Sequence, residues 1–414
     1  MAHVAVVGAG VVGLSAAWAL QQRGWQVTVV DRDLEGDRAS HGNAGCLAVG
    51  DCVPLSLAGL GLQPLRWLLD PLGPLAIRAG HAPKLWPWFQ ALRKASAPQE
   101  FERIGNALAD LNRHALAAFD AMVRQIGIGQ ALHKAQGLTL YETQQGWERD
   151  QASWQFRAQR GVQFRQLTRE EVQALEPGLA PVFERGVLFE SWGHVDDPRQ
   201  VVDQLRAHVA AQGGELVTGE AVRVQPQGPQ GAAVHLADGR VITADKVLVA
   251  AGAWSAQLAQ SLGERALLES ERGYNTTLPH SLGRIGREVM FAERMFVATP
   301  LAIGLRIGGT AEFAGLKAPP NYQRSAALLK LARRYFRDLD ETDARQWMGH
   351  RPSTPDSLPV LGASTRSPAV FYAFGHGHLG LTQSAISAQL LAQAMSGEET
   401  SLDLAPFSIA RFQR

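Results

Sequence analysis

Apolar and polar positions at the start of the chain predict a strand, a helix and a second strand. Residues 3–7 form a short apolar run, residues 14–23 carry a helical pattern, and residues 26–30 form a second apolar run. Both runs have the length of buried strands, and the segment between them has the length of one connecting helix. The pattern therefore predicts a β-α-β unit.

Three glycines and one acid in this unit predict a dinucleotide-binding site. Gly8, Gly10 and Gly13 form a G-x-G-x-x-G motif directly after the first strand. Gly8 permits a tight turn, Gly10 lets backbone N–H groups approach a pyrophosphate, and Gly13 lets helix and strand pack closely. The helix N-terminus adds about half a positive charge there. Asp31, at the end of the second strand, can accept hydrogen bonds from ribose hydroxyls and would repel a 2′-phosphate. The motif does not identify the dinucleotide.

Helical and strand patterns alternate along the rest of the chain. Further helices are predicted over residues 100–126, 149–160, 200–212 and 381–396, and further strands over residues 137–141, 186–189, 215–218, 221–224, 233–236, 241–244, 246–250 and 370–374. Thr168 begins a capping box, and Asp197 opens the helix over 200–212. Residues 270–335 are predicted to form antiparallel strands followed by a helix, and residues 349–352 to open an irregular loop.

Glycine clusters of the kind that contact ligands are spread over the whole sequence. They lie at residues 8–13, 42–45, 252 and 375–380. An NAD enzyme usually completes its cofactor site within one contiguous domain. A large cofactor that is contacted from both ends of the chain favours FAD.

Composition limits the class of protein further. The chain has 414 residues, 46% of them hydrophobic and 19% charged, which predicts two closely connected globular domains. The net charge of +1 provides no electrostatic field for nucleic acid. Cys46 and Cys52 lack a C-x-x-C pattern and are interpreted as reduced thiols, and no group of residues has metal-ligand spacing. No basic n-region precedes the first apolar run and no apolar stretch has the length of a bilayer span, so a cytoplasmic protein is expected.

Residues 53–98 differ from the rest because they are rich in prolines and aromatic residues, and the prolines forbid one long helix. Short helices that cover an active site are one interpretation, and a plain structural cover is another. A lid, a surface for a quinone or a protein partner, and shallow contact with the inner face of the membrane remain open alternatives.

Together the motifs resemble the D-amino-acid oxidase-like flavoproteins, and most closely the branch of the bacterial D-amino-acid dehydrogenase small subunit. The resemblance is carried by VAVVGAGVVGLSAAWAL, ASHGNAG, LVAAGAWS, GHRPSTPDSLPVLG and FGHGHLGLTQS. It implies a mixed α/β fold with a glutathione-reductase-like FAD-binding Rossmann domain and an interleaved antiparallel-sheet substrate domain. The FAD domain would comprise residues 1–52, 195–256 and 340–414, and the substrate domain residues 53–194 and 257–339.

The resemblance also implies which residues contact FAD. The pyrophosphate and ribose would lie on the N-terminal motif, adenine on Val222, and the flavin ring against the C-terminal glycine cluster. The implied cofactor residues are Gly8, Gly10, Val11, Val12, Gly13, Asp31, Arg32, Ser40, Asn43, Ala44, Gly45, Val222, Ala251, Gly252, Arg351, Gly375, Gly377, His378, Leu379, Gly380, Leu381 and Thr382.

Four residues are implied at the reacting end of the site. Arg351 would bind the substrate carboxylate with two parallel hydrogen bonds. His376 and His378 flank the expected flavin edge, where they orient the substrate, tune its protonation, or act as ordinary loop histidines. Tyr274 is interpreted either as lining the substrate pocket or as a core aromatic residue.

The implied reaction is oxidative deamination of D-amino acids. A hydride would pass from Cα to flavin N5, giving an imino acid that water hydrolyses, with the electrons passed to a quinone or another acceptor. Cyclic substrates such as D-proline or D-hydroxyproline are possible in this branch. The alternatives are a glycine- or sarcosine-type oxidase that uses O₂, an NAD-dependent dehydrogenase, and an FAD-binding subunit of a larger complex. The oligomeric state stays open.

Overall fold

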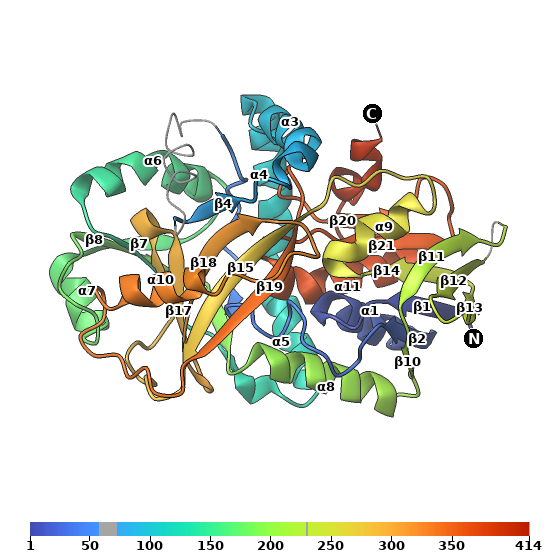
Figure 1. Cartoon of the computed structure of the whole chain (residues 1–414), viewed down its shortest axis with the longest axis horizontal. Helices are drawn as coiled ribbons and strands as arrows, with labels where there is room; N and C mark the ends of the chain where they lie inside the picture. Colours follow the sequence, from blue (N-terminus) through green and yellow to red (C-terminus); the bar gives the residue numbers. More distant parts are fainter. Residues whose placement is uncertain (58–72, 229–230, 414) are drawn as a thin grey trace.

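Two large sheets lie side by side in the computed structural model, which describes residues 1–57, 73–228 and 231–413 (Figure 1). A six-stranded sheet contains both the N-terminal strand and one of the last strands of the chain, and a nine-stranded sheet is built from the middle of the sequence. The fold is therefore mixed α/β, as the sequence predicts.

The six-stranded sheet has the order β10-β2-β1-β14-β21-β20 and is parallel except for β20. Its strands are β1 (His3–Val7), β2 (Gln26–Asp31), β10 (Glu215–Thr218), β14 (Lys246–Val249), β20 (Val360–Ala363) and β21 (Val370–Phe374). Strands β1, β2, β10, β14 and β21 agree with the sequence-based predictions to within one residue at each end.

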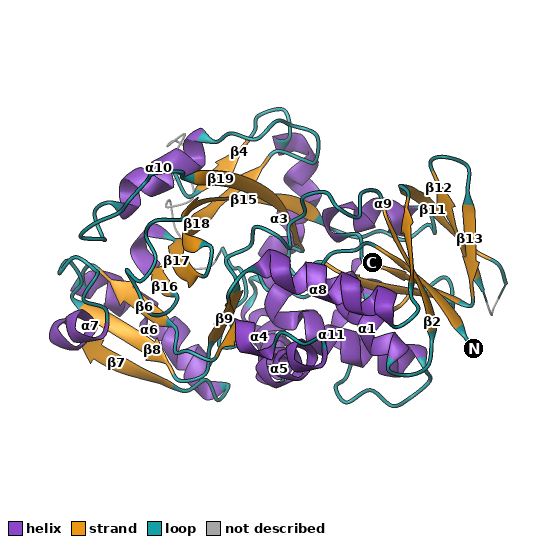
Figure 2. Cartoon of the chain, turned by 90° about the horizontal axis from the view of Figure 1, so that it is seen from below, coloured by secondary structure: helices purple, strands orange, loops and turns teal. Residues whose placement is uncertain are grey.

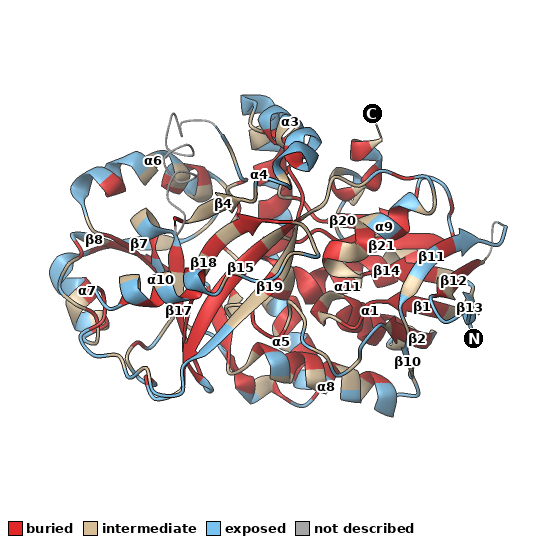
Figure 3. Cartoon of the chain, viewed as in Figure 1, coloured by how far each residue is buried: buried red, intermediate tan, exposed pale blue. Residues whose placement is uncertain are grey.

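Successive residues of β1 enter different cores, because side chains alternate between the two faces of a strand. Val4 and Val6 pack in the core formed with α1 (Val11–Gln21), α8 (Pro198–Ala211) and α11 (Gly380–Met395). Ala5 and Val7 pack in a second core, formed with β11 (Ala221–Pro226), β12 (Ala232–Leu236) and α9 (Ser255–Gln260). Strand β13 (Val241–Ala244) completes a small antiparallel sheet with β11 and β12. The parallel sheet is thus covered on both faces, and its central strands β1, β14 and β21 are buried, whereas the edge strand β10 is partly exposed (Figure 3).

The glycine turn between β1 and α1 has the geometry that the sequence predicts. Gly8 has a φ of +115°, and a Cβ atom there would lie 2.4 Å from the carbonyl oxygen of Ala250. A Cβ atom on Gly13 would lie 2.0 Å from the carbonyl oxygen of Gly8. The structure therefore confirms a tight turn at Gly8 and close helix–strand packing at Gly13.

The nine-stranded sheet has the order β19-β15-β18-β17-β16-β6-β8-β7, with β4 paired to β18. Its strands are β4 (Leu75–Ile77), β6 (Leu138–Tyr141), β7 (Phe164–Thr168), β8 (Arg185–Phe189), β15 (Glu269–Leu278), β16 (Val289–Phe291), β17 (Phe296–Leu301), β18 (Gly304–Phe313) and β19 (Arg345–Ser353). All pairs are antiparallel except β16–β6 and β18–β4. A separate core beneath this sheet includes residues of α7 (Arg169–Leu175) and α10 (Gln323–Ala332). Strands β3 (Cys46–Leu47), β5 (Leu132–His133) and β9 (Gly193–Val195) form a fourth, small sheet.

The helices confirm some predictions and correct others. Thr168 forms a complete capping box with Glu171, and Asp197 caps α8. The predicted single helix over 100–126 is wrong, because α4 (Pro98–Arg113) ends and α5 (Ala115–Gln125) begins on either side of His114. Among the described residues, the remaining α-helices are α3 (Trp86–Ala95) and α6 (Gln144–Gln159), the latter starting before the predicted residue 149.

The prediction of an irregular loop at residues 349–352 is also wrong. These residues lie in β19, which pairs with β15 along its whole length. The pattern of polar and apolar residues does not predict this strand, because the exposed and half-buried positions of β19 do not alternate regularly. Residues 58–72 of the proline- and aromatic-rich segment lie outside the described residues, and α3 gives the only long helix among residues 73–98.

The predicted domain boundaries do not coincide with the edges of the sheets. Strand β19 follows residue 340, where the FAD domain is predicted to resume, and yet it belongs to the nine-stranded sheet. Helices α4 and α5 come from the predicted substrate segment, and Figure 2 shows them beside α11 and α1. The side-chain amide of Gln383 in α11 donates to Asn112 Oδ1 in α4 at 2.9 Å. The segments are therefore interleaved in space as well as in sequence.

We expect Gly13→Ala to lower the free energy of unfolding of the FAD-free protein by at least about 1–3 kcal/mol, because the new Cβ would overlap a backbone carbonyl. Gly10→Ala is the matched control, since its Cβ would meet only Ser40 Oγ at 3.4 Å. Chemical denaturation measures both variants. Equal stability of the two would contradict the close packing at Gly13.

Candidate active site

A cavity of about 1590 Å³ lies where the two sheets meet. Its walls include the β1–α1 turn, the segment after residue 40, the ends of β14 and β21, and the facing strands β15, β18 and β19. Ligand pockets in proteins usually measure about 300–1,000 Å³. The cavity therefore has room for a large cofactor and a small substrate together.

One end of the cavity contains the N-terminus of α1 and a fixed carboxylate. Helix α1 begins after Gly10, which has no side chain with which to cap it, and Val11 N–H donates to Ser40 Oγ at 3.0 Å. Asp31 Oδ2 accepts a hydrogen bond from Ala9 N–H at 2.7 Å. Arg38 lies 3.8 Å from the same carboxylate. These contacts hold the acid beside the turn, and the positive end of the α1 dipole at this wall of the cavity favours an anionic group such as a pyrophosphate.

The segment after residue 40 is hydrogen-bonded to the nine-stranded sheet. Asn43 Oδ1 accepts from Gly45 N–H at 2.7 Å, which closes a local turn. Asn275 on β15 donates to the carbonyl of Gly42 at 2.6 Å, and Arg306 on β18 donates to the carbonyl of Asn43 at 2.6 Å. Neither Asn275 nor Arg306 was a sequence-based candidate, because only the folded structure brings them to this loop.

Most of the predicted site residues line this one cavity. Those that do are Gly8, Gly10, Val11, Val12, Asp31, Arg32, Ser40, Asn43, Ala44, Val222, Ala251, Gly252, Tyr274, Arg351, His376, Gly377, His378, Gly380 and Leu381. Gly13, Gly45, Gly375, Leu379 and Thr382 do not line it and lie behind its wall. Thr382 illustrates this second group, since its hydroxyl accepts from Ala48 N–H at 3.0 Å.

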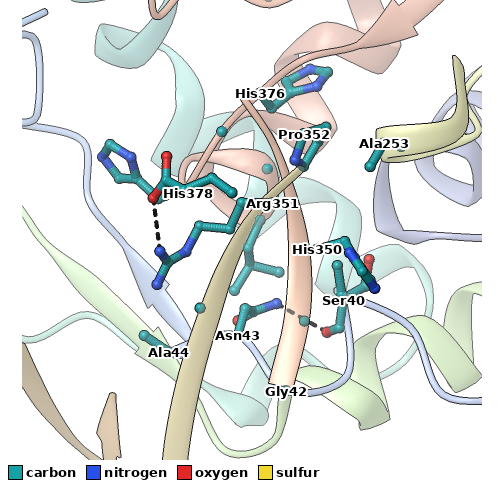
Figure 4. Close-up of a pocket in the computed structure, with 18 of the residues that line it drawn as sticks. Ser40, Gly42, Asn43, Ala44, Ala253, His350, Arg351, Pro352, His376 and His378 are labelled. Atoms are coloured by element: carbon teal, nitrogen blue, oxygen red, sulfur yellow. Dashed lines mark hydrogen bonds and ion pairs between the residues drawn. The ribbon is translucent and has the colours of Figure 1, made fainter. Parts of the chain in front are cut away.

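Arg351 projects from β19 into the cavity with part of its guanidinium unused (Figure 4). Its Nη1 donates to Glu271 Oε1 at 2.9 Å and to the carbonyl of Thr310 at 3.0 Å. Nε and Nη2 have no hydrogen-bond partner within residues 1–57, 73–228 and 231–413. The guanidinium lies against Gly273, where a Cβ atom would be 2.4 Å from Nη2. A planar group held on one edge can bind a carboxylate with its other edge.

The two histidines of the C-terminal glycine cluster have opposite environments. His376 is 3% exposed, and its Nε2 lies 3.1 Å from Ser387 Oγ. Burial lowers the pKa of His376 to about 3, so its ring is neutral. The side chain of His378 is 63% exposed because it faces the cavity, and its Nε2 lies 2.7 Å from Asp51 Oδ2.

The surroundings of His378 shift its pKa in both directions. Desolvation lowers the pKa of His378, but the hydrogen bond and the charge of Asp51 outweigh it, so the net shift is upward. Asp51 lies in turn 3.7 Å from Arg157 Nη2 on α6. Asp51, Arg157 and Glu271 all line the cavity and were not sequence-based candidates, since isolated charges in loops, helices and strands carry no motif.

Tyr274 has its hydroxyl engaged elsewhere. The residue is 1% exposed, its hydroxyl donates to Glu312 Oε2 at 2.5 Å, and it accepts from Asn321 N–H at 3.0 Å. Tyr274 therefore borders the cavity as a buried, anchored aromatic residue.

His350 is a further cavity residue that sequence reasoning missed. Its Nδ1 lies 2.7 Å from Ser270 Oγ, and its ring meets Trp254 edge-on at 5.3 Å. Burial, with help from the charges of Arg272 and Arg32, lowers the pKa of His350 to about 4. Arg32 in turn lies over the Trp254 ring at 3.9 Å. Figure 4 shows His350 pointing to the side of β19 opposite Arg351.

The structure also limits other chemistry. No group of three or more His, Cys, Asp or Glu side chains is arranged to hold a metal ion in the part of the chain that the structure describes. Among these same residues no helix combines the length and the apolar character needed to cross a bilayer. Cys46 and Cys52 are both free thiols.

The doubly covered parallel sheet, the glycine turn at its edge and the adjoining cavity define a dinucleotide-binding protein. The family model described as "FAD dependent oxidoreductase" matches residues 3–394. The chain belongs to this family, and its cofactor is FAD.

Relatives of known name cover the whole chain. A D-amino-acid oxidase of Bradyrhizobium diazoefficiens is 35% identical over 99% of both chains, and a D-amino acid dehydrogenase of Agrobacterium fabrum is 29% identical over 99% of both. The crystal structure of glycine oxidase from Geobacillus kaustophilus has a TM-score of 0.78 at 23% identity, covering 99% of each chain. That likeness shows that the fold is shared. It confirms the glutathione-reductase-like fold expected from the sequence.

The residues present fit FAD. The cavity is continuous from Val222 and Arg32, past the start of α1, to Arg351 and His378. A second helix N-terminus, that of α11, begins at the cavity wall with no side-chain cap and no acidic residue in its first turn. Such a terminus favours negative charge on a bound ring.

We expect the buried neutral His376 to make the protein less stable in acid. Its pKa is 6.5 in the unfolded chain and about 3 in the folded one, so the unfolded state binds the extra proton between these values. The free energy of unfolding should therefore fall as the pH drops from 6.5 towards 3, by at most about 1.4 kcal/mol per pH unit from this residue.

Urea denaturation at several pH values measures this effect as the difference between the wild type and His376→Gln. The control is His280→Gln, which alters an exposed pair with Asp343. An identical pH slope in the wild type and His376→Gln would rule out the assignment.

Proposed function

We propose that this protein catalyses the FAD-dependent oxidative deamination of D-amino acids. The observation that carries the proposal is Arg351, which lines the cavity and whose Nε and Nη2 have no hydrogen-bond partner among the described residues, while Glu271 and Thr310 hold Nη1. The relatives named D-amino-acid oxidase and D-amino acid dehydrogenase, which match the whole chain, support the choice of substrate class.

We propose that the cofactor lies along the predicted residues. The β1–α1 turn, with Gly8, Gly10, Val11 and Val12, would hold the pyrophosphate, and Asp31 the ribose. Ser40, Asn43 and Ala44 would follow it towards the ring. Gly13, Gly45, Gly375, Leu379 and Thr382 would support these contacts from behind the cavity wall. FAD, when bound, supplies the acceptor for the hydride that leaves Cα.

Arg351 orients the substrate in this proposal. Two parallel charge-assisted hydrogen bonds to the carboxylate fix the direction of the Cα–H bond. Glu271 holds the guanidinium and is itself held by Ser353, whose hydroxyl donates to Glu271 Oε2 at 2.8 Å. The product is an imino acid, which water hydrolyses to a 2-oxo acid and ammonium.

A second candidate function differs in the electron acceptor and the substrate. The relative that is 35% identical is named an oxidase and the one at 29% a dehydrogenase, so these names leave the electron acceptor of this protein open. A glycine- or sarcosine-type oxidase would use O₂. Peroxide release in air without an added dye would favour it, whereas turnover only with an artificial dye would favour a dehydrogenase.

Anaerobic bleaching of the flavin absorption band tests the proposal. The panel comprises D- and L-amino acids, D-proline, D-hydroxyproline, glycine and sarcosine. Rapid bleaching by D-amino acids supports the proposed function, and preference for glycine or sarcosine supports the second candidate. Failure of every compound to bleach the bound flavin would refute both.

We expect Arg351→Ala to raise KM for the amino acid steeply, because it removes the partner of a desolvated carboxylate. A loss of about 2–5 kcal/mol is typical, and each 1.4 kcal/mol is a factor of ten in kcat/KM. Arg345→Ala is the matched control, since Arg345 lies exposed on the same strand and outside the cavity. Unchanged kinetics in Arg351→Ala would remove the role of this residue.

A further inference from the structure

A histidine and an aspartate form a pair on the substrate side of the cavity. His378 Nε2 lies 2.7 Å from Asp51 Oδ2, and both residues line the cavity. Asp51 follows β3, and His378 directly precedes the N-terminus of α11, so segments more than three hundred residues apart build the pair. Asp51 Oδ1 lies 3.7 Å from Arg157 Nη2, which fixes the carboxylate from the opposite side.

The pair leaves one ring nitrogen unused. Nε2 of His378 is occupied by Asp51, and Nδ1 has no hydrogen-bond partner in the described part of the chain. Since the carboxylate accepts only, Nε2 carries the proton and the neutral ring has a lone pair on Nδ1. Figure 4 shows His378 and Arg351 on the same side of β19.

Charged groups from every neighbouring element bear on this ring. Asp51 and Glu271 stabilise its protonated form, whereas Arg351 disfavours it. Arg157 on α6 offsets part of the charge of Asp51, and Glu271 is paired with Arg351. Glu288, buried beside Trp192 just before β16, also lines the cavity. The positive end of α11 disfavours an imidazolium, and Asp51 compensates for it.

We propose that His378, positioned by Asp51, removes a proton from the ammonium group of the amino acid whose carboxylate Arg351 binds. The inference rests on the proposed function and deepens it. An amino acid arrives in neutral water with a protonated nitrogen, and only the neutral amine has the lone pair that forms the C=N bond as Cα loses its hydride.

The step transfers one proton and no electrons. One N–H bond of the substrate ammonium breaks, an N–H bond forms at His378 Nδ1, and the amine nitrogen keeps its electron pair. The imidazolium is held by Asp51 and returns its proton to solvent through the cavity, which His378 faces with 63% of its side chain exposed. His378 is then a catalytic residue, and Asp51 is a positioning residue.

The other two cavity histidines do not meet these requirements. His376 is buried, and its Nε2 lies against Ser387 Oγ. His350 lies against Ser270 and Trp254, on the far side of β19 from Arg351. Neither has a carboxylate within hydrogen-bond distance among the residues described.

The pH dependence of kcat/KM for D-amino acids and of anaerobic flavin reduction tests the inference. We expect an acidic limb in the wild type above pH 6.5, the ordinary value for histidine, because Asp51 raises the pKa of His378. His378→Gln should slow flavin reduction at pH 7 by about 10²–10⁴-fold. Its deficit should shrink as the pH rises towards the pKa of the substrate ammonium, since the substrate then arrives already deprotonated.

Asp51→Asn should move the acidic limb to lower pH, because it removes the charge that raises the pKa of His378, and Asp51→Glu should restore part of the shift. The matched control is His133→Gln, since His133 Nε2 lies 2.6 Å from Asp196 Oδ1 in an exposed pair outside the cavity. That variant should keep the wild-type profile.

The outcomes separate the inference from the function on which it rests. A wild type whose flavin no amino acid bleaches would refute the proposed function. A wild type that is bleached by D-amino acids would overturn the inference alone if His378→Gln had the same deficit at every pH, or if Asp51→Asn left the acidic limb in place.

Discussion

The close approach of three backbone segments at the ends of β1 and β14 is the constraint on which the rest of the structure depends. Gly8 lies so near the carbonyl of Ala250, and Gly13 so near the carbonyl of Gly8, that neither position has room for a side chain. This contact brings the start of α1 to the edge of the sheet, and with it the dipole and the backbone donors that an anionic cofactor needs.

From that edge the cavity extends into a region where several charged side chains form ion pairs. Arg351 is held by Glu271, His378 by Asp51, and Asp51 by Arg157, so each of these three side chains has a charged partner. A fixed partner reduces the rotational freedom of a side chain before the substrate arrives, which lowers the entropic cost of orienting it. The nine-stranded sheet contributes Arg351 and Glu271, whereas the six-stranded sheet's side of the cavity contributes the glycine turn and the start of α11.

Local steric rules made the cofactor half predictable from sequence. A strand, three glycines, a helix and an acid are neighbours in the chain, so their geometry follows from their order. The part of the cavity around Arg351 and His378 depends on pairing between distant segments. His376 and His378 are separated by one glycine, and yet one is buried against Ser387 and the other faces Asp51. Nothing in the local sequence distinguishes them.

Two predictions were wrong, the single helix over residues 100–126 and the irregular loop at residues 349–352, and each error has a physical cause. His114 has nearly helical dihedral angles, φ −95° and ψ −8°, so the apolar spacing continues across the break between α4 and α5. Residues 349–352 become a strand only because β15 lies alongside them. The spacing of hydrophobic residues indicates which face of a helix or strand is buried, and it carries no information about a partner strand elsewhere in the chain.

The order of strands in the six-stranded sheet has a consequence for how the protein is made. Strand β1 lies between β2, which follows at once, and β14, which emerges from the ribosome more than two hundred residues later; β21 and α11 come later still. A nascent chain that has been translated only to its middle therefore contains the β1–α1 turn but lacks β14, which ends beside that turn. It also lacks α11, which packs on α1. Such a chain exposes apolar strand surface that chaperones recognise. The surroundings of the β1–α1 turn are therefore complete only after nearly the whole chain has been translated.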